Sequence, residues 1–204
     1  MTSPDDVPTG PEIVPPSTAG ADPSPRQEAV DRTVRELEHH VAAGGWDGPV
    51  RLFALVRTAD ALDRDPDLAE QLPADVVDAA HADAEHLTAV EQENLPDVDT
   101  VEALLGRIAW PSTVDGAALV LERVVVPPEA EADLPANPDA AMGYLENHPD
   151  RRDVRLAAAV LRDGTHACAV RARDHDSDDD VATGPDLVPG LVTALATTLE
   201  DPAD

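Results

Sequence analysis

Six arginines are concentrated in residues 151–173, within a chain that is otherwise strongly acidic. Against two aspartates they give this segment a net charge of +4, whereas the whole chain of 204 residues carries −28. Arginine can bind a carboxylate or phosphate through two parallel N–H donors, so the segment is suited to hold an anion. We therefore select Arg155, Arg171 and Arg173 as candidate ligand-binding residues. The alternative is internal pairing, in which the arginines hold acidic loops such as 129–133 or 174–180 against the sheet.

Carboxylates are concentrated directly after this segment. Asp174, Asp176 and Asp178 have the spacing of the first three ligands in a calcium-binding loop. Two later positions do not fit, because Asp179 stands where such loops have a turn glycine and Pro185 stands where they have a bidentate glutamate. The three aspartates are candidate ligands of a weakly bound divalent cation. The alternative, which these departures favour, is a solvated acidic loop.

His166 and Cys168 are the only residues whose spacing suggests a nucleophile and its base, since alternate residues of a strand share a face. A cysteine buried in an apolar strand would instead be inert. The chain has no lysine, which excludes a P-loop lysine, a Schiff-base lysine and an anchor for pyridoxal phosphate. It also lacks a zinc-enzyme motif, a nucleophile elbow and a glycine-rich phosphate loop. We assign no catalytic residue and expect no cofactor, which favours a non-enzymatic role without deciding it.

The composition narrows the classes of partner. A net charge of −28 disfavours binding to nucleic acid or to anionic lipid, and aromatic residues make up only 2% of the chain, too few for base-stacking platforms. No apolar run approaches 18 residues, and the N-terminus lacks the order of a signal peptide. A single cysteine cannot form an internal disulfide. These features predict a cytoplasmic protein.

The elements that would position these residues can be read from hydrophobic periodicity. Residues 1–24 hold six prolines and no basic residue, which predicts a disordered tail, so we expect one domain over residues 25–204. Ser24 and Pro25 begin a helix whose apolar stripe ends at Gly44. We expect an α+β fold, with a mainly antiparallel sheet of four to five strands packed by about six helices. The strands are expected at 50–56, 87–90, 117–126, 154–161 and 165–173, and the later helices include 97–108, 138–147 and 187–199.

Asp163-Gly164 predicts a type I′ turn between the last two of these strands. In that register Val154 and Leu156 share a face with Ala169, and Arg171 and Arg173 project from this same face. Both faces of the hairpin are apolar near its turn, which predicts a central position in the sheet with cover on both sides.

Several stretches of the chain resemble a family of actinobacterial proteins that has no assigned function. The likeness runs from about Arg35 to Leu199. It is carried by Ile108-Ala109-Trp110-Pro111, by Glu122 to Pro128, by His148-Pro149-Asp150-Arg151, and most strongly by the stretch from Leu161 through His175-Asp176 to Leu191. The resemblance implies a cytoplasmic α+β protein from an actinobacterium, and it implies no reaction, ligand or catalytic residue.

Two functions follow from these residues. The first is a non-enzymatic cytoplasmic binding or assembly protein, as a homodimer or with another protein as its partner. The alternative is a protein that binds an anionic small ligand, or an unrecognised enzyme, using the arginines of 151–173. The two differ in whether these arginines are already paired within the fold, and in whether an apolar surface is exposed.

Overall fold

The structure, a computed structural model, describes residues 22–98 and 100–200 as one α+β domain. The predicted tail lies outside the described residues except for residues 22–24, which are exposed and lead into the first helix.

One antiparallel sheet of six strands forms the centre of the described domain, in the order β2-β1-β3-β4-β5-β6. The sequence indicates five of them, and the additional strand is β6, three residues that pair with β5 at the sheet edge. The segment Ala182–Gly184 has neither an apolar run nor alternation, so only its pairing with β5 defines it as a strand. The strands are β1 (Arg51–Arg57), β2 (Leu87–Glu91), β3 (Gly116–Val125), β4 (Arg152–Leu161), β5 (His166–Ala172) and β6 (Ala182–Gly184).

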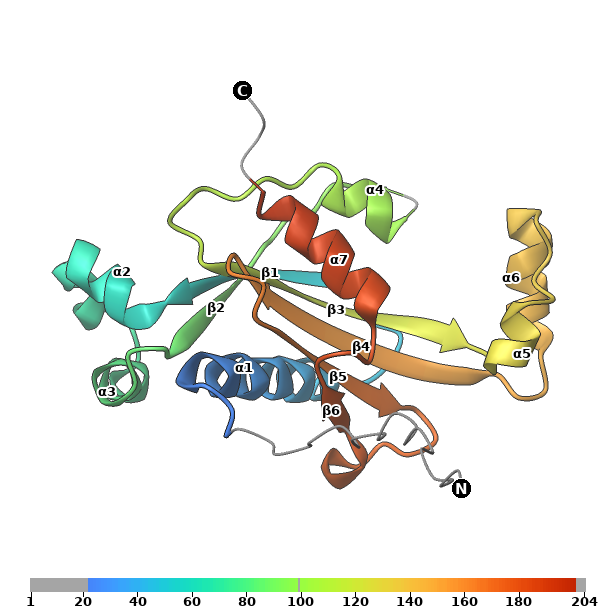
Figure 1. Cartoon of the computed structure of the whole chain (residues 1–204), viewed down its shortest axis with the longest axis horizontal. Coiled ribbons are helices and arrows are strands. Elements are labelled where there is room, and N and C mark those ends of the chain that lie inside the picture. Colours follow the sequence, from blue (N-terminus) through green and yellow to red (C-terminus); the bar gives the residue numbers. More distant parts are fainter. Residues whose placement is uncertain (1–21, 99, 201–204) are drawn as a thin grey trace, which may run out of the picture.

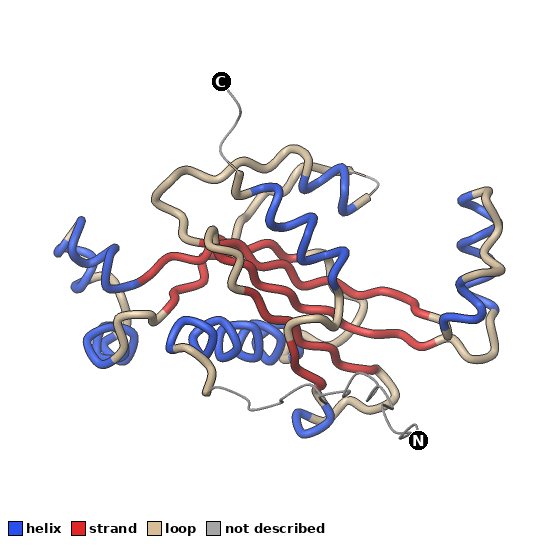
Figure 2. The backbone as a smooth tube through the Cα atoms, in the orientation of Figure 1, coloured by secondary structure: helices blue, strands red, loops and turns tan. Residues whose placement is uncertain are grey.

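Helices cover both faces of the sheet, α1 on one and α7 with α4 on the other (Figures 1 and 2). Over the residues that the structure describes, no helix combines the length and the apolar character needed to cross a bilayer. The α-helices are α1 (Pro25–Ala42), α2 (Thr58–Arg64), α3 (Ala74–Ala82), α4 (Val101–Leu105), α5 (Pro128–Glu131), α6 (Pro138–Asn147) and α7 (Pro189–Thr198), and the short 3₁₀ helices are η1 (Pro66–Glu70) and η2 (Asp178–Asp180).

The predicted first helix is confirmed, and it packs on one of the two apolar clusters of the core. The Ser24 hydroxyl accepts a hydrogen bond from the Gln27 amide (3.2 Å), which caps the helix. Val30, Val34 and Leu37 are buried against the face of the sheet that carries Phe53. On the opposite face, Leu195 of α7 and Leu199, the residue that follows this helix, complete a second apolar cluster. Strand β4 lies between β3 and β5 and is buried on both faces, as predicted for the hairpin.

The predicted register of this hairpin was wrong by one residue. The Leu161 amide donates to the Thr165 carbonyl (2.8 Å), and Gly164 has a φ of +86°, so the connection is a three-residue loop and not a type I′ turn. A shift of one residue exchanges the two faces of a strand. Ala157 therefore lies opposite Ala169, and Arg171 lies opposite Arg155 on the α1 face, not on the face of Val154 and Leu156.

Two other segments differ from expectation. The helix expected over 97–108 is only α4, because the Thr100 hydroxyl accepts from the Ala103 amide (3.1 Å) and starts the helix there. The acidic stretch expected to be a loop, residues 129–138, contains most of α5. The helix expected over 138–147 is confirmed as α6.

Strands β3 and β4 extend beyond the helices that cover the sheet, and residues 126–150 join them at this end (Figure 1). We call residues 126–150 the arm. It carries α5 and α6, and α6 stands apart from α1 and α7 (Figure 1).

Candidate functional site

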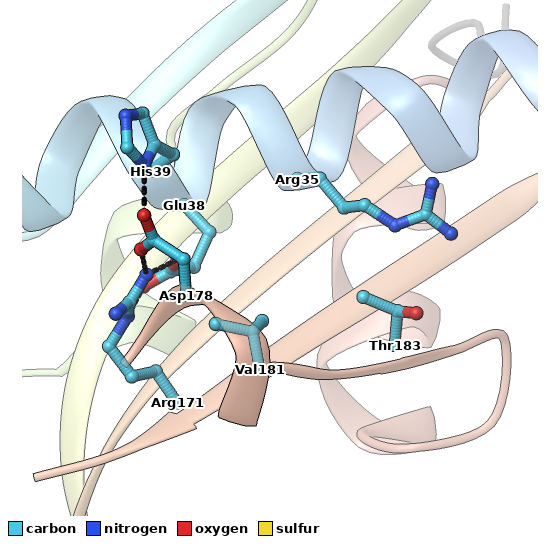
Figure 3. A pocket seen from close by; sticks show the side chains of 7 residues that line it. All are labelled: Arg35, Glu38, His39, Arg171, Asp178, Val181 and Thr183. Atoms are coloured by element: carbon cyan, nitrogen blue, oxygen red, sulfur yellow. Dashed lines mark hydrogen bonds and ion pairs between the residues drawn. The ribbon is translucent and has the colours of Figure 1, made fainter. Parts of the chain in front are cut away.

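A buried carboxylate of α1 organises the arginines that the sequence selects. Glu38, Arg155 and Arg171 expose 1%, 0% and 2% of their surfaces. Arg171 makes a bidentate pair with Glu38, in which Nε donates to Oε1 (2.7 Å) and Nη2 to Oε2 (2.7 Å) (Figure 3). Arg155 and Arg171 are direct register partners in β4 and β5, so two positive charges face each other across the hairpin. Glu38 is the anion that makes this arrangement stable, because like charges placed opposite one another destabilise a sheet.

Arg155 is also bound by groups from outside the hairpin. Its Nη2 donates to the Gly45 carbonyl and to Glu122 Oε1 (2.9 Å), and its Nη1 lies 3.5 Å from Glu38 Oε1. The guanidinium lies 4.4 Å from the centre of the Trp46 ring, a cation–π contact. The loop that follows α1 is therefore held to the sheet by Arg155.

Arg173 binds this same loop from the surface. Its Nη1 and Nη2 donate to the two carboxylate oxygens of Asp47, at 2.7 and 2.9 Å. It also lies 5.4 Å from the Trp46 ring. All three candidate arginines are thus bound to groups of the protein itself.

The candidate metal ligands do not come together as a set. Asp176 and Asp178 both bind Arg171, at 3.4 Å from Nη1 and 2.7 Å from Nη2, so this loop is held to the sheet as the internal-pairing alternative predicts. Asp174 instead lies 3.2 Å from His175 Nδ1. Within residues 22–98 and 100–200, no group of three or more His, Cys, Asp or Glu side chains is placed to hold a metal ion.

A cavity of about 260 Å³ lies beside the buried pair, between α1 and the segment that ends in β6 (Figure 3). The Arg35 side chain extends away from the Glu38–Arg171 pair, towards Thr183 (Figure 3). The Arg171 side chain that borders the cavity is committed to Glu38, Asp176 and Asp178. The cavity therefore offers a ligand no free guanidinium from β5. Its lining residues are Arg35, Glu38, His39, Arg171, Asp178, Val181 and Thr183.

The sequence reasoning missed the residues that organise this cluster. Glu38 is four residues after Val34 and three before Val41, which places it on the apolar face of α1. A charged residue on a buried stripe is the signal that identifies it, since a buried charge requires a partner. Trp46 and Glu122 carry no comparable signal, because only the folded chain brings them to Arg155.

The ion pairs between arginine and carboxylate side chains make the stability of the fold depend on pH. The hydrogen bond from Arg171 lowers the pKa of Asp178, and that from Arg51 lowers the pKa of Glu91. A carboxyl whose pKa is lowered by folding stabilises the fold above its unfolded pKa of about 4, and this stabilisation is lost as the pH falls through the lower folded value. We expect the midpoint temperature of thermal unfolding to decrease as the pH is lowered from 5 to 3. A midpoint that is unchanged at pH 3 would contradict this role of the pairs.

Cys168 is fully buried on the α7 face, and burial raises the pKa of its thiol. Its Sγ is 3.4 Å from the Pro185 carbonyl, while His166 Nδ1 is 2.7 Å from the Gly164 carbonyl. We expect Cys168→Ala to lower the free energy of unfolding by about 1 kcal/mol, and the native thiol to react slowly with a thiol reagent. Fast labelling of the folded protein would instead indicate a reactive cysteine.

The arm is the second surface with a distinct character. None of the α6 side chains that the structure describes, residues 140–147, is buried, although the helix contains Met142, Tyr144 and Leu145. Met142 is 57% exposed, and Leu134, which precedes α6 in the arm, is 36% exposed. In most proteins tertiary packing of an apolar face stabilises a helix of this length. Helix α6 thus has fewer buried side chains among its described residues than α1 and α7 have.

Comparisons with known proteins identify a family. A family model described as PPA1309-like protein matches residues 30–200. Searches of curated proteins and of solved structures found no match to the chain.

Proposed function

The chain belongs to the PPA1309-like protein family, and we propose that it is a non-enzymatic binding protein that docks a protein partner through the arm. The observation that carries this proposal is the exposure of helix α6, which has no buried side chain among residues 140–147 and presents Met142 with 57% of its surface exposed. Exposed apolar surface that the fold itself does not use is typical of a protein interface.

The pairing of the arginines supports the same proposal. A site for an anionic ligand needs cations that are free to bind it, and Arg155, Arg171 and Arg173 each bind carboxylates of this chain. They hold α1, the loop after it and the loop before β6 to the sheet. This pairing disfavours the alternative function, an anionic small-ligand protein or an enzyme built on the arginines of 151–173, because the three arginines selected for it already bind carboxylates.

We also propose that the protein works in the cytoplasm of an actinobacterium. The support is the absence of lysine beside abundant alanine, aspartate and arginine, which suits a GC-rich coding sequence, together with a single cysteine that is buried and free.

Site-specific photo-cross-linking in cells that naturally produce the protein tests the docking surface. A photoreactive amino acid at Met142 is expected to form an adduct with another protein. The matched control is Val90, which is 48% exposed on the edge strand β2, outside the arm, and is expected to give none. No adduct at position 142, or the same adducts at both positions, would overturn the proposal.

A further inference from the structure

The charge of the arm identifies the kind of partner that fits it. Residues 126–150 contain six acidic residues and neither lysine nor arginine. The side chains of Glu129, Asp133, Glu146 and Asp150 are exposed, and none of these four forms an ion pair with another described residue. Elsewhere in the domain, Asp47, Glu91 and Asp178 are each bound by an arginine. These four carboxylates of the arm thus remain available to cations from outside the chain.

We propose that the arm binds a basic protein surface, one in which lysine and arginine side chains surround an apolar centre. This inference rests on the proposed function and names the chemistry of its partner. Exposed Met142 and Leu134 supply the apolar contact, and the exposed carboxylates of the same arm supply negative charge. An apolar centre within a charged rim is the usual arrangement of a protein interface.

The acidic residues of the arm disfavour the binding of other kinds of partner. Two copies of the arm would bring six acidic residues against six, and the chains that carry them have a net charge of −28 each. Nucleic acid and anionic lipid are repelled for the same reason. A basic partner is attracted by the whole molecule, which speeds its encounter, and the arm then supplies the specific contact.

Two synthetic amphipathic helical peptides test this inference on the purified full-length protein. They share one leucine face, and their polar faces consist of lysine in one peptide and glutamate in the other. We expect the lysine peptide to bind and the glutamate peptide not to bind, as measured by fluorescence anisotropy. The variant Glu129→Lys/Asp133→Lys should weaken binding about tenfold, because charges at an interface rim are being reversed.

The control is a double variant with the same net charge as Glu129→Lys/Asp133→Lys, in which the two charge reversals lie outside the arm. Glu70→Lys/Glu93→Lys changes two exposed residues outside the arm and should alter the affinity by less than about twofold. Equal weakening by both double variants would show attraction to net charge alone and would overturn the proposal, as would binding of the glutamate peptide. If the lysine peptide fails while the cross-link at position 142 persists, the basic partner is wrong and the docking role stands. If the cross-link is absent as well, both are wrong.

Discussion

Replacing Glu38 with alanine is expected to lower the free energy of unfolding by about 3–5 kcal/mol. The carboxylate is 1% exposed and receives two hydrogen bonds of 2.7 Å from Arg171, and it lies 3.5 Å from Arg155. Its removal leaves two buried guanidinium groups opposite each other on β4 and β5 with less compensation. Urea unfolding followed by circular dichroism measures the change.

The matched control is Glu36→Ala, which removes an exposed glutamate from the same helix. It should change the free energy of unfolding by less than about 0.5 kcal/mol, as is usual for surface positions. A loss below about 1 kcal/mol for Glu38→Ala would show that the buried cluster does not stabilise the fold.

Replacing Arg171 with alanine should be comparably destabilising, at about 3–5 kcal/mol. The change removes both hydrogen bonds to Glu38 and the ion pairs to Asp176 and Asp178, so the loop between β5 and β6 loses its ion pairs with the sheet. Arg35→Ala is the control, because Arg35 lines the same cavity and is exposed.

Arg171→Ala also separates the two functions considered for the arginines. A thermal-shift screen of phosphates, carboxylates and nucleotides should show no compound that stabilises the wild type through Arg171. A compound that stabilises the wild type and not the variant would identify an anion site and overturn internal pairing.

The helices and strands with strong local patterns could be predicted from the sequence. The stripe of α1, the apolar run of β1 and the long β3 are marked by periodicity that does not depend on distant residues. Strand β6 could not be predicted, because its three residues are extended only through pairing with β5. The register predicted for the hairpin was wrong because of its turn. Asp163-Gly164 also occurs in a three-residue loop with glycine in the left-handed region, and this is the loop that the structure has.

The candidate site was predicted in part. Arg155, Arg171 and the acidic loop after β5 were recognised from their local charge, and the structure brings them together at Glu38. Glu122 and the loop that carries Trp46 and Asp47 contact Arg155 and Arg173 across 33 to 126 residues of sequence. The sequence has no local signal for such distant contacts. The exposure of α6 likewise depends on what packs against it and cannot be read from its own residues.

The central claim is that stability and binding reside in different parts of the molecule, the buried arginine cluster and the arm. A competition measurement tests it most directly, with untagged proteins competing for the partner that is cross-linked at position 142. Wild type and Val90→Asp should compete equally, whereas Met142→Asp should fail to compete although it unfolds at the same urea concentration as wild type. If Met142→Asp competes as well as wild type, the arm is not the binding surface.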